Sequence, residues 1–183
     1  LGQRGIGKTT AMVQYLLDAA AQDPLSETIL YVQADHFMIR DRSLYDIAEH
    51  FVNLGGRVIC FDEIHNYPHW SLELKSITDT FAGLKVLASG SSALEIYKGS
   101  HDLSRRALQL RMWGMSLREY AELSLGITLP AYPLARMLSD HVRIAHDVVD
   151  QLASHKILAL FRSYLRHGYY PFYFEDRNET VFA

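Results

Sequence analysis

The chain opens with a glycine-rich run that reads Gly2-Gln3-Arg4-Gly5-Ile6-Gly7-Lys8-Thr9-Thr10. Its spacing fits the pattern G-x-x-x-x-G-K-[ST] without a mismatch. In a loop of this kind, glycines let successive backbone N–H groups converge on a phosphate, and the following helix adds its positive N-terminal end. The alternative is a chance match in a glycine-rich turn. A run of apolar residues at helical spacing follows the loop directly, which favours the phosphate-binding interpretation.

Each part of this loop has an expected role in binding ATP and Mg²⁺. We expect Lys8 to reach the β- and γ-phosphates and the hydroxyl of Thr9 to bind Mg²⁺. A strand normally precedes such a loop, and only Leu1 precedes it here, so we expect that first strand to be missing from the chain. The residues predicted to bind the nucleotide are Gly2, Arg4, Gly5, Ile6, Gly7, Lys8, Thr9 and Thr10.

A second candidate site follows the apolar run 58–61 and consists of the acidic pair Asp62 and Glu63. A buried strand that delivers acids at its carboxyl end is typical of a Walker B element. We expect Asp62 to hold Mg²⁺ through water and Glu63 to polarise the attacking water. One alternative is an ordinary solvated loop. Another is the D-E-x-H element of helicases, which need two ATPase lobes where this chain has room for one.

Buried strands and helices alternate along most of the chain. The segments 29–32 and 58–61 are apolar throughout, 85–88 is apolar after Lys85, and a further strand is expected at 107–112. Strands of this kind, separated by helices, favour an α/β fold with a parallel sheet covered by helices on both faces. From Pro133 onward the apolar residues keep helical spacing, which predicts a small helical region.

Several further motifs occur in the same order as in one prokaryotic family of ATPases with an AAA domain, and the chain resembles that family. The resemblance is strong over about residues 1–125 and weak over 164–172. Besides the phosphate loop, it rests on Tyr31-Val32-Gln33-Ala34-Asp35, Phe61-Asp62-Glu63-Ile64-His65-Asn66-Tyr67-Pro68-His69-Trp70, Ser89-Gly90-Ser91-Ser92-Ala93-Leu94, Asp102-Leu103-Ser104-Arg105-Arg106 and Met115-Ser116-Leu117-Arg118-Glu119-Tyr120.

The resemblance implies an AAA-like P-loop NTPase core, and the change of pattern between Gly126 and Pro133 places its end at residue 128. Residues 129–183 are then a helical region that begins the connection to a C-terminal restriction-nuclease-like domain, which we expect to be absent from this chain. Members of the family also use a polar sensor of the γ-phosphate after the third strand. Ser89 and Ser91 are both candidates for that role, and the alternative is a Ser-rich turn that caps a helix beginning near Ser92.

The resemblance further implies an arginine finger at or near Arg105 and Arg106, with Arg106 favoured. A guanidinium group on the γ-phosphate offsets charge that develops in the transition state. Such a finger is often supplied by a neighbouring subunit, so a homo-oligomer is an expected partner. The alternative is a pair of exposed arginines flanking a strand.

Composition places broad limits on function. The chain has 183 residues, of which 49% are hydrophobic, and a net charge of −3, as expected for a soluble globular protein. This charge gives no general attraction to nucleic acid or to an anionic membrane, so a nucleic-acid partner has no support from composition. Cys60 is the single cysteine, which excludes an internal disulfide and suits a cytoplasmic location.

Three functions remain as hypotheses at this point. The first is Mg²⁺-dependent ATP hydrolysis, which the glutamate directly after Asp62 favours. The second is a nucleotide-gated switch or scaffold that binds ATP with little turnover. The third is a DNA-associated motor or the ATPase partner of a nuclease, and only the family resemblance suggests it.

Overall fold

The computed structural model describes residues 1–39, 41–91, 103, 106–152 and 155–174. These residues belong to two compact units, Leu1–Met112 and Trp113–Ala183. The first unit contains a three-stranded parallel sheet in the order β1-β2-β3. Its strands are β1 (Ile29–Gln33), β2 (Val58–Asp62) and β3 (Lys85–Ala88).

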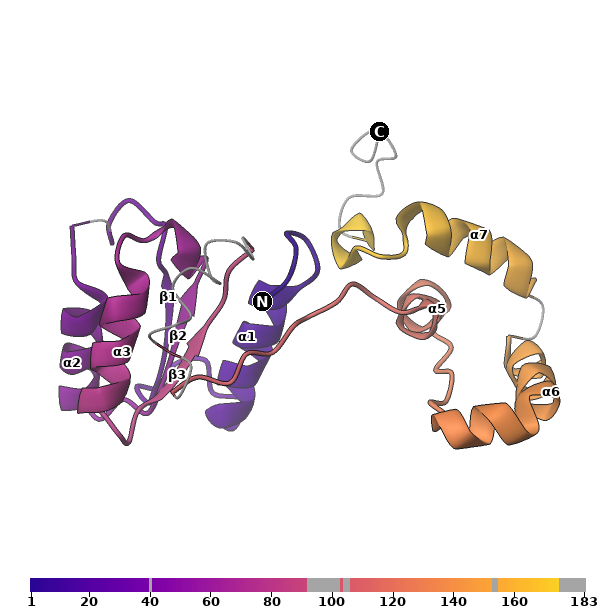
Figure 1. Ribbon diagram of the computed structural model, residues 1–183, viewed down its shortest axis with the longest axis horizontal. Coiled ribbons are helices and arrows are strands. Elements are labelled where there is room, and N and C mark those ends of the chain that lie inside the picture. Colours follow the sequence, from indigo (N-terminus) through magenta and orange to yellow (C-terminus); the bar gives the residue numbers. More distant parts are fainter. Residues whose placement is uncertain (40, 92–102, 104–105, 153–154, 175–183) are drawn as a thin grey trace. The chain divides into compact units, whose positions relative to one another are not determined.

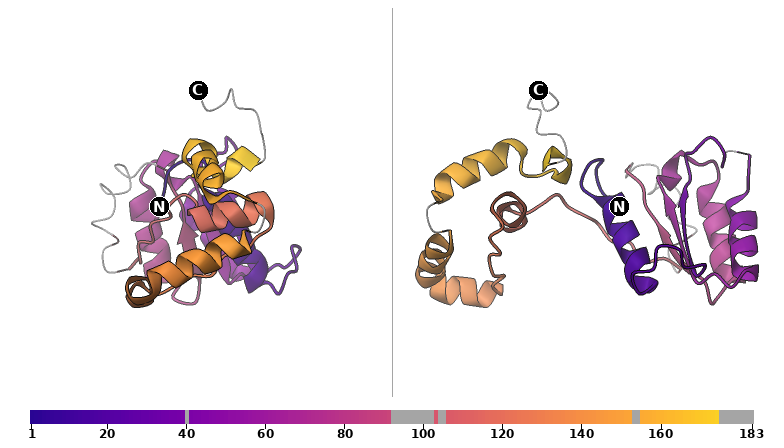
Figure 2. Two further views of the ribbon diagram at one scale, coloured as in Figure 1. Left: turned by 90° about the vertical axis from the view of Figure 1, so that its right-hand side faces the viewer. Right: turned by 180° about the vertical axis from the view of Figure 1, so that it is seen from behind.

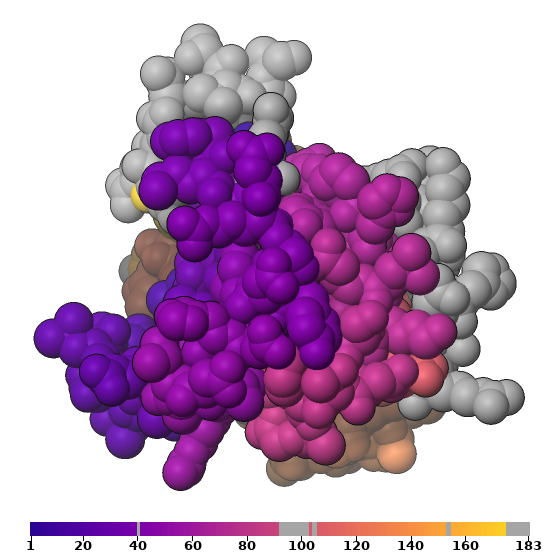
Figure 3. Space-filling view, turned by 90° about the vertical axis from the view of Figure 1, so that its left-hand side faces the viewer, coloured from indigo at the N-terminus to yellow at the C-terminus, as the bar shows by residue number. Residues whose placement is uncertain are grey.

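Helices cover both faces of this sheet (Figures 1 and 2). On one face lie α2 (Leu44–Asn53) and α3 (Trp70–Thr80), which connect β1 to β2 and β2 to β3; Figure 3 views this face. On the other face lies α1 (Lys8–Ala19). The fold is therefore α/β and agrees with the predicted P-loop, AAA-like architecture.

The alternation of side chains along β2 explains the two layers. Ile59 and Phe61 are fully buried in the larger hydrophobic cluster with residues of α2 and α3. Cys60 points to the other face, where it packs with Met12 and Leu16 of α1. Because both faces of β2 are buried, its sequence is apolar at every position up to Asp62.

The strand predicted at 107–112 is not formed, and this prediction is wrong. The segment lies extended, with Leu108 and Leu110 largely exposed. The N-terminal amino group of Leu1 donates to the Leu110 carbonyl at 2.7 Å, and the N–H of Met112 donates to the Leu1 carbonyl at 2.6 Å. This is the hydrogen-bonding pattern of a parallel ladder, but it is only one residue long. A single residue opposite the segment is too little to establish a strand.

The second unit is helical. It contains α5 (Leu117–Leu125), α6 (Leu134–Gln151), α7 (Ile157–His167) and the short 3₁₀ helix η2 (Pro171–Phe174). These elements enclose a separate hydrophobic cluster made of Met115, Tyr120, Ala121, Leu129, Leu152 and Leu160. The predicted helical region thus exists, although the division between units falls after Met112 and assigns α5 to the second unit. The domain boundary at residue 128 stays a prediction.

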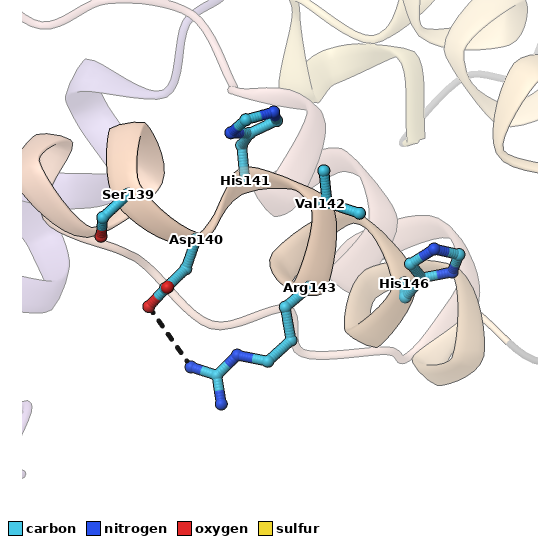
Figure 4. Close-up of a pocket in the computed structure, with 6 residues that line it drawn as sticks. All are labelled: Ser139, Asp140, His141, Val142, Arg143 and His146. Atoms are coloured by element: carbon cyan, nitrogen blue, oxygen red, sulfur yellow. Dashed lines mark hydrogen bonds and ion pairs between the residues drawn. The ribbon is translucent and has the colours of Figure 1, made fainter.

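Helix α6 is kinked at Asp140, whose φ and ψ angles of −122° and 20° are not helical. A shallow hollow lies along the kink, and the guanidinium of Arg143 donates to the Asp140 carboxylate at 3.4 Å (Figure 4). Both side chains are substantially exposed, so this ion pair adds little to stability. Within the described residues, no helix is both long and apolar enough to cross a bilayer.

Candidate active site

The glycine-rich loop forms a compact turn directly before α1. Gly5 and Gly7 have φ angles of 82° and 90°, a left-handed conformation that favours glycine over other residues. The loop is anchored by Ile6, which is 2% exposed. Within the described part of the chain, no side chain caps the N-terminus of α1. Its first N–H groups are therefore available to an anion.

Lys8 begins α1 and is positioned by the loop itself. Its side chain is buried, at 7% exposure, and its Nζ donates to the backbone carbonyl of Gln3 at 2.9 Å. At Gly2, a Cβ atom would lie 2.6 Å from the Met112 carbonyl oxygen and would also collide with Ile6. The loop thus curls tightly around the ammonium group, as a phosphate-binding cradle requires.

Asp62 connects the sheet to the glycine-rich loop through hydrogen bonds. It ends β2, is 2% exposed, and accepts four hydrogen bonds. Thr9 Oγ1 and the hydroxyl of Tyr31 both donate to Oδ2, at 2.6 and 2.8 Å. The hydroxyl of Ser89 and the N–H of Glu63 donate to Oδ1, the latter at 3.0 Å. Four hydrogen bonds saturate a carboxylate that would otherwise be costly to bury.

These hydrogen bonds also set the charge of the site. Burial by itself raises the pKa of the Asp62 carboxyl, but the hydrogen bonds from Ser89, Thr9, Tyr31 and the Glu63 amide outweigh it. The pKa of Asp62 therefore lies below its ordinary value. The pKa of the Tyr31 hydroxyl is raised, first by burial and then by its bond to the carboxylate. The site therefore holds an ionised Asp62 next to a neutral Tyr31 hydroxyl at neutral pH.

Glu63 follows in an uncommon backbone conformation, with φ and ψ of 49° and 37°. Positive φ is costly for a residue with a Cβ atom, and such conformations often occur at functional sites. The Glu63 Oε2 atom lies 3.3 Å from the hydroxyl of Ser91, which donates to it, and 3.3 Å from Nδ1 of His65. Ser91 Oγ in turn lies 3.2 Å from Nε2 of His65.

The two serines thus have different neighbours in the structure. Ser89 contacts Asp62, and Ser91 contacts Glu63. The sequence alone does not distinguish them, because both follow β3 at the same edge of the sheet. Each is placed where it contacts one member of the acidic pair.

The predicted arginine finger is not close to these groups in its own chain. The Arg106 side chain donates to the Asp79 carboxylate at 2.5 Å. Asp79 lies in the last turn of α3, which runs from the carboxyl end of β2 back to the start of β3. Arg106 therefore lies toward the edge of the sheet opposite to Asp62. Arg105 lies outside the described residues, as does the helix expected from Ser92.

Two polar residues of the site, Tyr31 and His65, have no predicted role in binding or hydrolysing ATP. Tyr31 belongs to one of the family-like motifs, and its position on β1, next to β2 in the sheet, gives its hydroxyl access to Asp62. His65 follows Glu63 by two residues, and that spacing is the signal that the sequence offers. Cys60, by contrast, is fully buried, and burial followed by the nearby charge of Asp62 raises the pKa of its thiol to about 12. It is a packing residue.

The oxygen atoms gathered here fit a magnesium nucleotide. Mg²⁺ prefers oxygen ligands and retains several waters, so a hydroxyl and one carboxylate are the protein groups it needs. Thr9 Oγ1 could supply the hydroxyl directly and Asp62 the carboxylate through water, and the two groups lie 2.6 Å apart beside the uncapped N-terminus of α1. Among the described residues, no cluster of three or more His, Cys, Asp or Glu side chains forms an all-protein metal site.

Comparison with known proteins identifies the family of the chain. A family model for the AAA domain matches residues 1–121. The chain is also 31% identical, over 189 aligned residues, to an uncharacterized protein of Methanocaldococcus jannaschii. The alignment covers 99% of this chain and 39% of that protein, so the chain spans well under half the length of its relative. On the strength of the family match, the chain belongs to the AAA domain family and carries an AAA-type ATPase domain.

Proposed function

We propose that the protein binds ATP with Mg²⁺ and hydrolyses it. The observation that carries this proposal is the 2.6 Å hydrogen bond between Thr9 and Asp62, which joins the glycine-rich loop to the acidic pair in one site. Lys8 and the N–H groups of the loop bind the phosphates. Thr9 through its hydroxyl and Asp62 through water would hold Mg²⁺, which would offset negative charge on the phosphates.

The remaining residues act on the water and on the γ-phosphate. Glu63 accepts a hydrogen bond from the attacking water and so orients this water toward the γ-phosphate. Ser89 or Ser91 senses that phosphate through its hydroxyl. Arg106, or Arg105, acts as a finger on the nucleotide of a neighbouring subunit, since Arg106 lies far from the site of its own chain. The proposal thus includes a homo-oligomer, a cytoplasmic location and, in the full-length protein, a restriction-nuclease-like domain.

The test compares Glu63→Gln and Lys8→Ala in the full-length protein. We expect Glu63→Gln to bind ATP as the wild type does and to lose at least about 100-fold in kcat, since it keeps the shape of the side chain but not its charge. Lys8→Ala should lose ATP affinity. Glu49→Gln, an exposed glutamate on α2, is the matched control and should change neither quantity.

The measurements are steady-state phosphate release and binding of a fluorescent ATP analogue. A wild type that releases phosphate no faster than Glu63→Gln contradicts the proposal. If the wild type also binds ATP, and ATP dissociates far faster than it is hydrolysed, the protein is a nucleotide-gated switch instead. Absence of ATP binding by the wild type would exclude both functions.

A further inference from the structure

We propose that His65 is a positioning residue that fixes the carboxylate of Glu63 for hydrolysis. This inference rests on the proposed ATPase function and assigns to it a residue that the phosphate loop and the acidic pair do not include. It starts from a compact cluster of three polar side chains. Glu63, His65 and Ser91 approach one another pairwise at 3.2 to 3.3 Å.

The backbone that carries this cluster is held firmly. The N–H of Ile64 donates to the Ser89 carbonyl at 2.9 Å, which ties the turn after β2 to the end of β3. Ile64 is 1% exposed, and the hydroxyl of Tyr67 lies within hydrogen-bond distance of two acceptors, the Arg42 carbonyl at 2.9 Å and the Glu73 carboxylate at 3.0 Å. The 3₁₀ helix η1 (Ile64–Asn66) is therefore fixed at both ends, and its orientation directs the His65 ring toward Glu63.

The flexible side chain of Glu63 requires a neighbouring group that fixes its conformation. The glutamate side chain has several rotamers, and a carboxylate that orients a water molecule must keep one of them. His65 and Ser91 both approach Oε2, which leaves Oε1 as the oxygen that faces the water in this assignment.

Burial makes these contacts effective. The side chains of His65 and Glu63 are 11% and 24% exposed, so water competes weakly for them. His65 Nδ1 is shielded from solvent and lies 3.3 Å from Oε2, in poor alignment for a hydrogen bond. In a neutral ring, Nδ1 donates to Oε2 only in the tautomer whose Nε2 accepts the proton of the Ser91 hydroxyl. Such a contact improves with a small rotation of the carboxylate, and catalytic hydrogen bonds commonly tighten when the substrate binds.

The test uses three substitutions of His65 in the full-length protein. We expect His65→Ala to lower kcat by roughly 10- to 100-fold, by analogy with the loss found when a residue that orients a metal ligand is removed. The KM for ATP should stay unchanged, because the interaction acts on the water and not on nucleotide binding. His50→Ala, which removes an exposed histidine from the last turn of α2, is the matched control and should behave as the wild type.

Two conservative variants separate positioning from simple packing. The amide of Asn reaches the place of Nδ1, which faces Glu63, and the amide of Gln reaches the place of Nε2, which faces Ser91. His65→Asn should therefore recover much of the lost kcat, and His65→Gln should stay close to His65→Ala. Thermal unfolding and binding of the fluorescent ATP analogue check that each variant is folded.

Each outcome decides for or against the inference. Wild-type turnover in His65→Ala, or recovery by Gln without recovery by Asn, would overturn it while leaving ATP hydrolysis intact. A rise in KM without a fall in kcat would also overturn it, since that result indicates a role in binding. If His65→Ala fails to fold, the difference between the Asn and Gln variants gives the answer. A wild type without hydrolysis would overturn the proposed function itself.

Discussion

Asp62 couples the nucleotide loop to the sheet through a single side chain. Its donors Thr9, Tyr31 and Ser89 belong to α1, to β1 and to the segment after β3. Hydrogen bonds to an ionised acceptor are stronger than those between neutral groups, which offsets the cost of burying this carboxylate. The charged Asp62 carboxylate therefore links α1, β1 and the segment after β3 through hydrogen bonds, in addition to its proposed role with Mg²⁺.

We expect Asp62 to make the stability of the protein sensitive to acid. The pKa of Asp62 is lower in the folded state than in the unfolded state. Its contribution to the free energy of unfolding is therefore complete above the ordinary carboxyl range, near about pH 4, and is lost as the pH falls through the folded pKa. In Asp62→Asn, stability at neutral pH should fall by about 1–3 kcal/mol, because an amide cannot accept all four hydrogen bonds.

The same variant should also lose stability less steeply than the wild type between about pH 5 and about pH 3. Urea unfolding at a series of pH values, followed by circular dichroism, measures both effects. Parallel pH profiles for the wild type and Asp62→Asn would show that the carboxylate contributes nothing to the acid sensitivity.

At the scale of the elements, the start of α2 depends on contacts with α3. Ser43 caps α2 by accepting hydrogen bonds from the N–H groups of Tyr45 and Asp46, at 3.1 and 3.3 Å. It also donates to Glu73 of α3 at 3.1 Å, and Glu73 accepts a further bond from the Tyr45 N–H at 3.0 Å. The cap therefore serves both the end of one helix and its packing against the next.

Ser43→Ala should lower the free energy of unfolding by about 1 kcal/mol, the usual effect of losing an N-cap. Ser76→Ala in α3 is the control, because Ser76 is exposed and its hydroxyl only donates to the Leu72 carbonyl within the same helix. We expect this control to be neutral or slightly stabilising, since alanine has the higher helix propensity. Equal losses in the two variants, measured by urea unfolding, would contradict a role for the cap.

Local pattern was sufficient to predict most of these elements. The runs 29–32, 58–61 and 85–88 all lie in strands, as β1, β2 and β3, but only β2 is buried on both faces. The segment 107–112 alternates apolar residues with Gln109 and Arg111, and its ladder-type hydrogen bonds involve Leu1 alone. Strand formation depends on pairing, which a local pattern does not report. The contact between Tyr31 and Asp62 likewise joins residues on separate strands, which a local pattern does not predict.

At the scale of the whole molecule, the two compact units have separate hydrophobic clusters. Those of the first unit are built on the sheet, and the cluster of the second is built on α5, α6 and α7. Within the described residues, the clusters of the two units have no member in common. The residues proposed to bind and cleave ATP all belong to the first unit.

This separation predicts that a defect in one core leaves the other intact. Leu152 is 1% exposed in the helical cluster, so Leu152→Ala should lower the free energy of unfolding of that unit by about 2–5 kcal/mol. Amide hydrogen exchange should then be faster in α5, α6 and α7 but unchanged in β2, and the affinity for ATP should equal that of the wild type. Ile77→Ala, in the core beneath the sheet, should show the reverse pattern and weaken ATP binding. Faster amide exchange in β2 of Leu152→Ala would contradict this prediction. It would mean that the two units unfold together in one cooperative transition, so that a substitution in one cluster lowers the free energy of unfolding of both units.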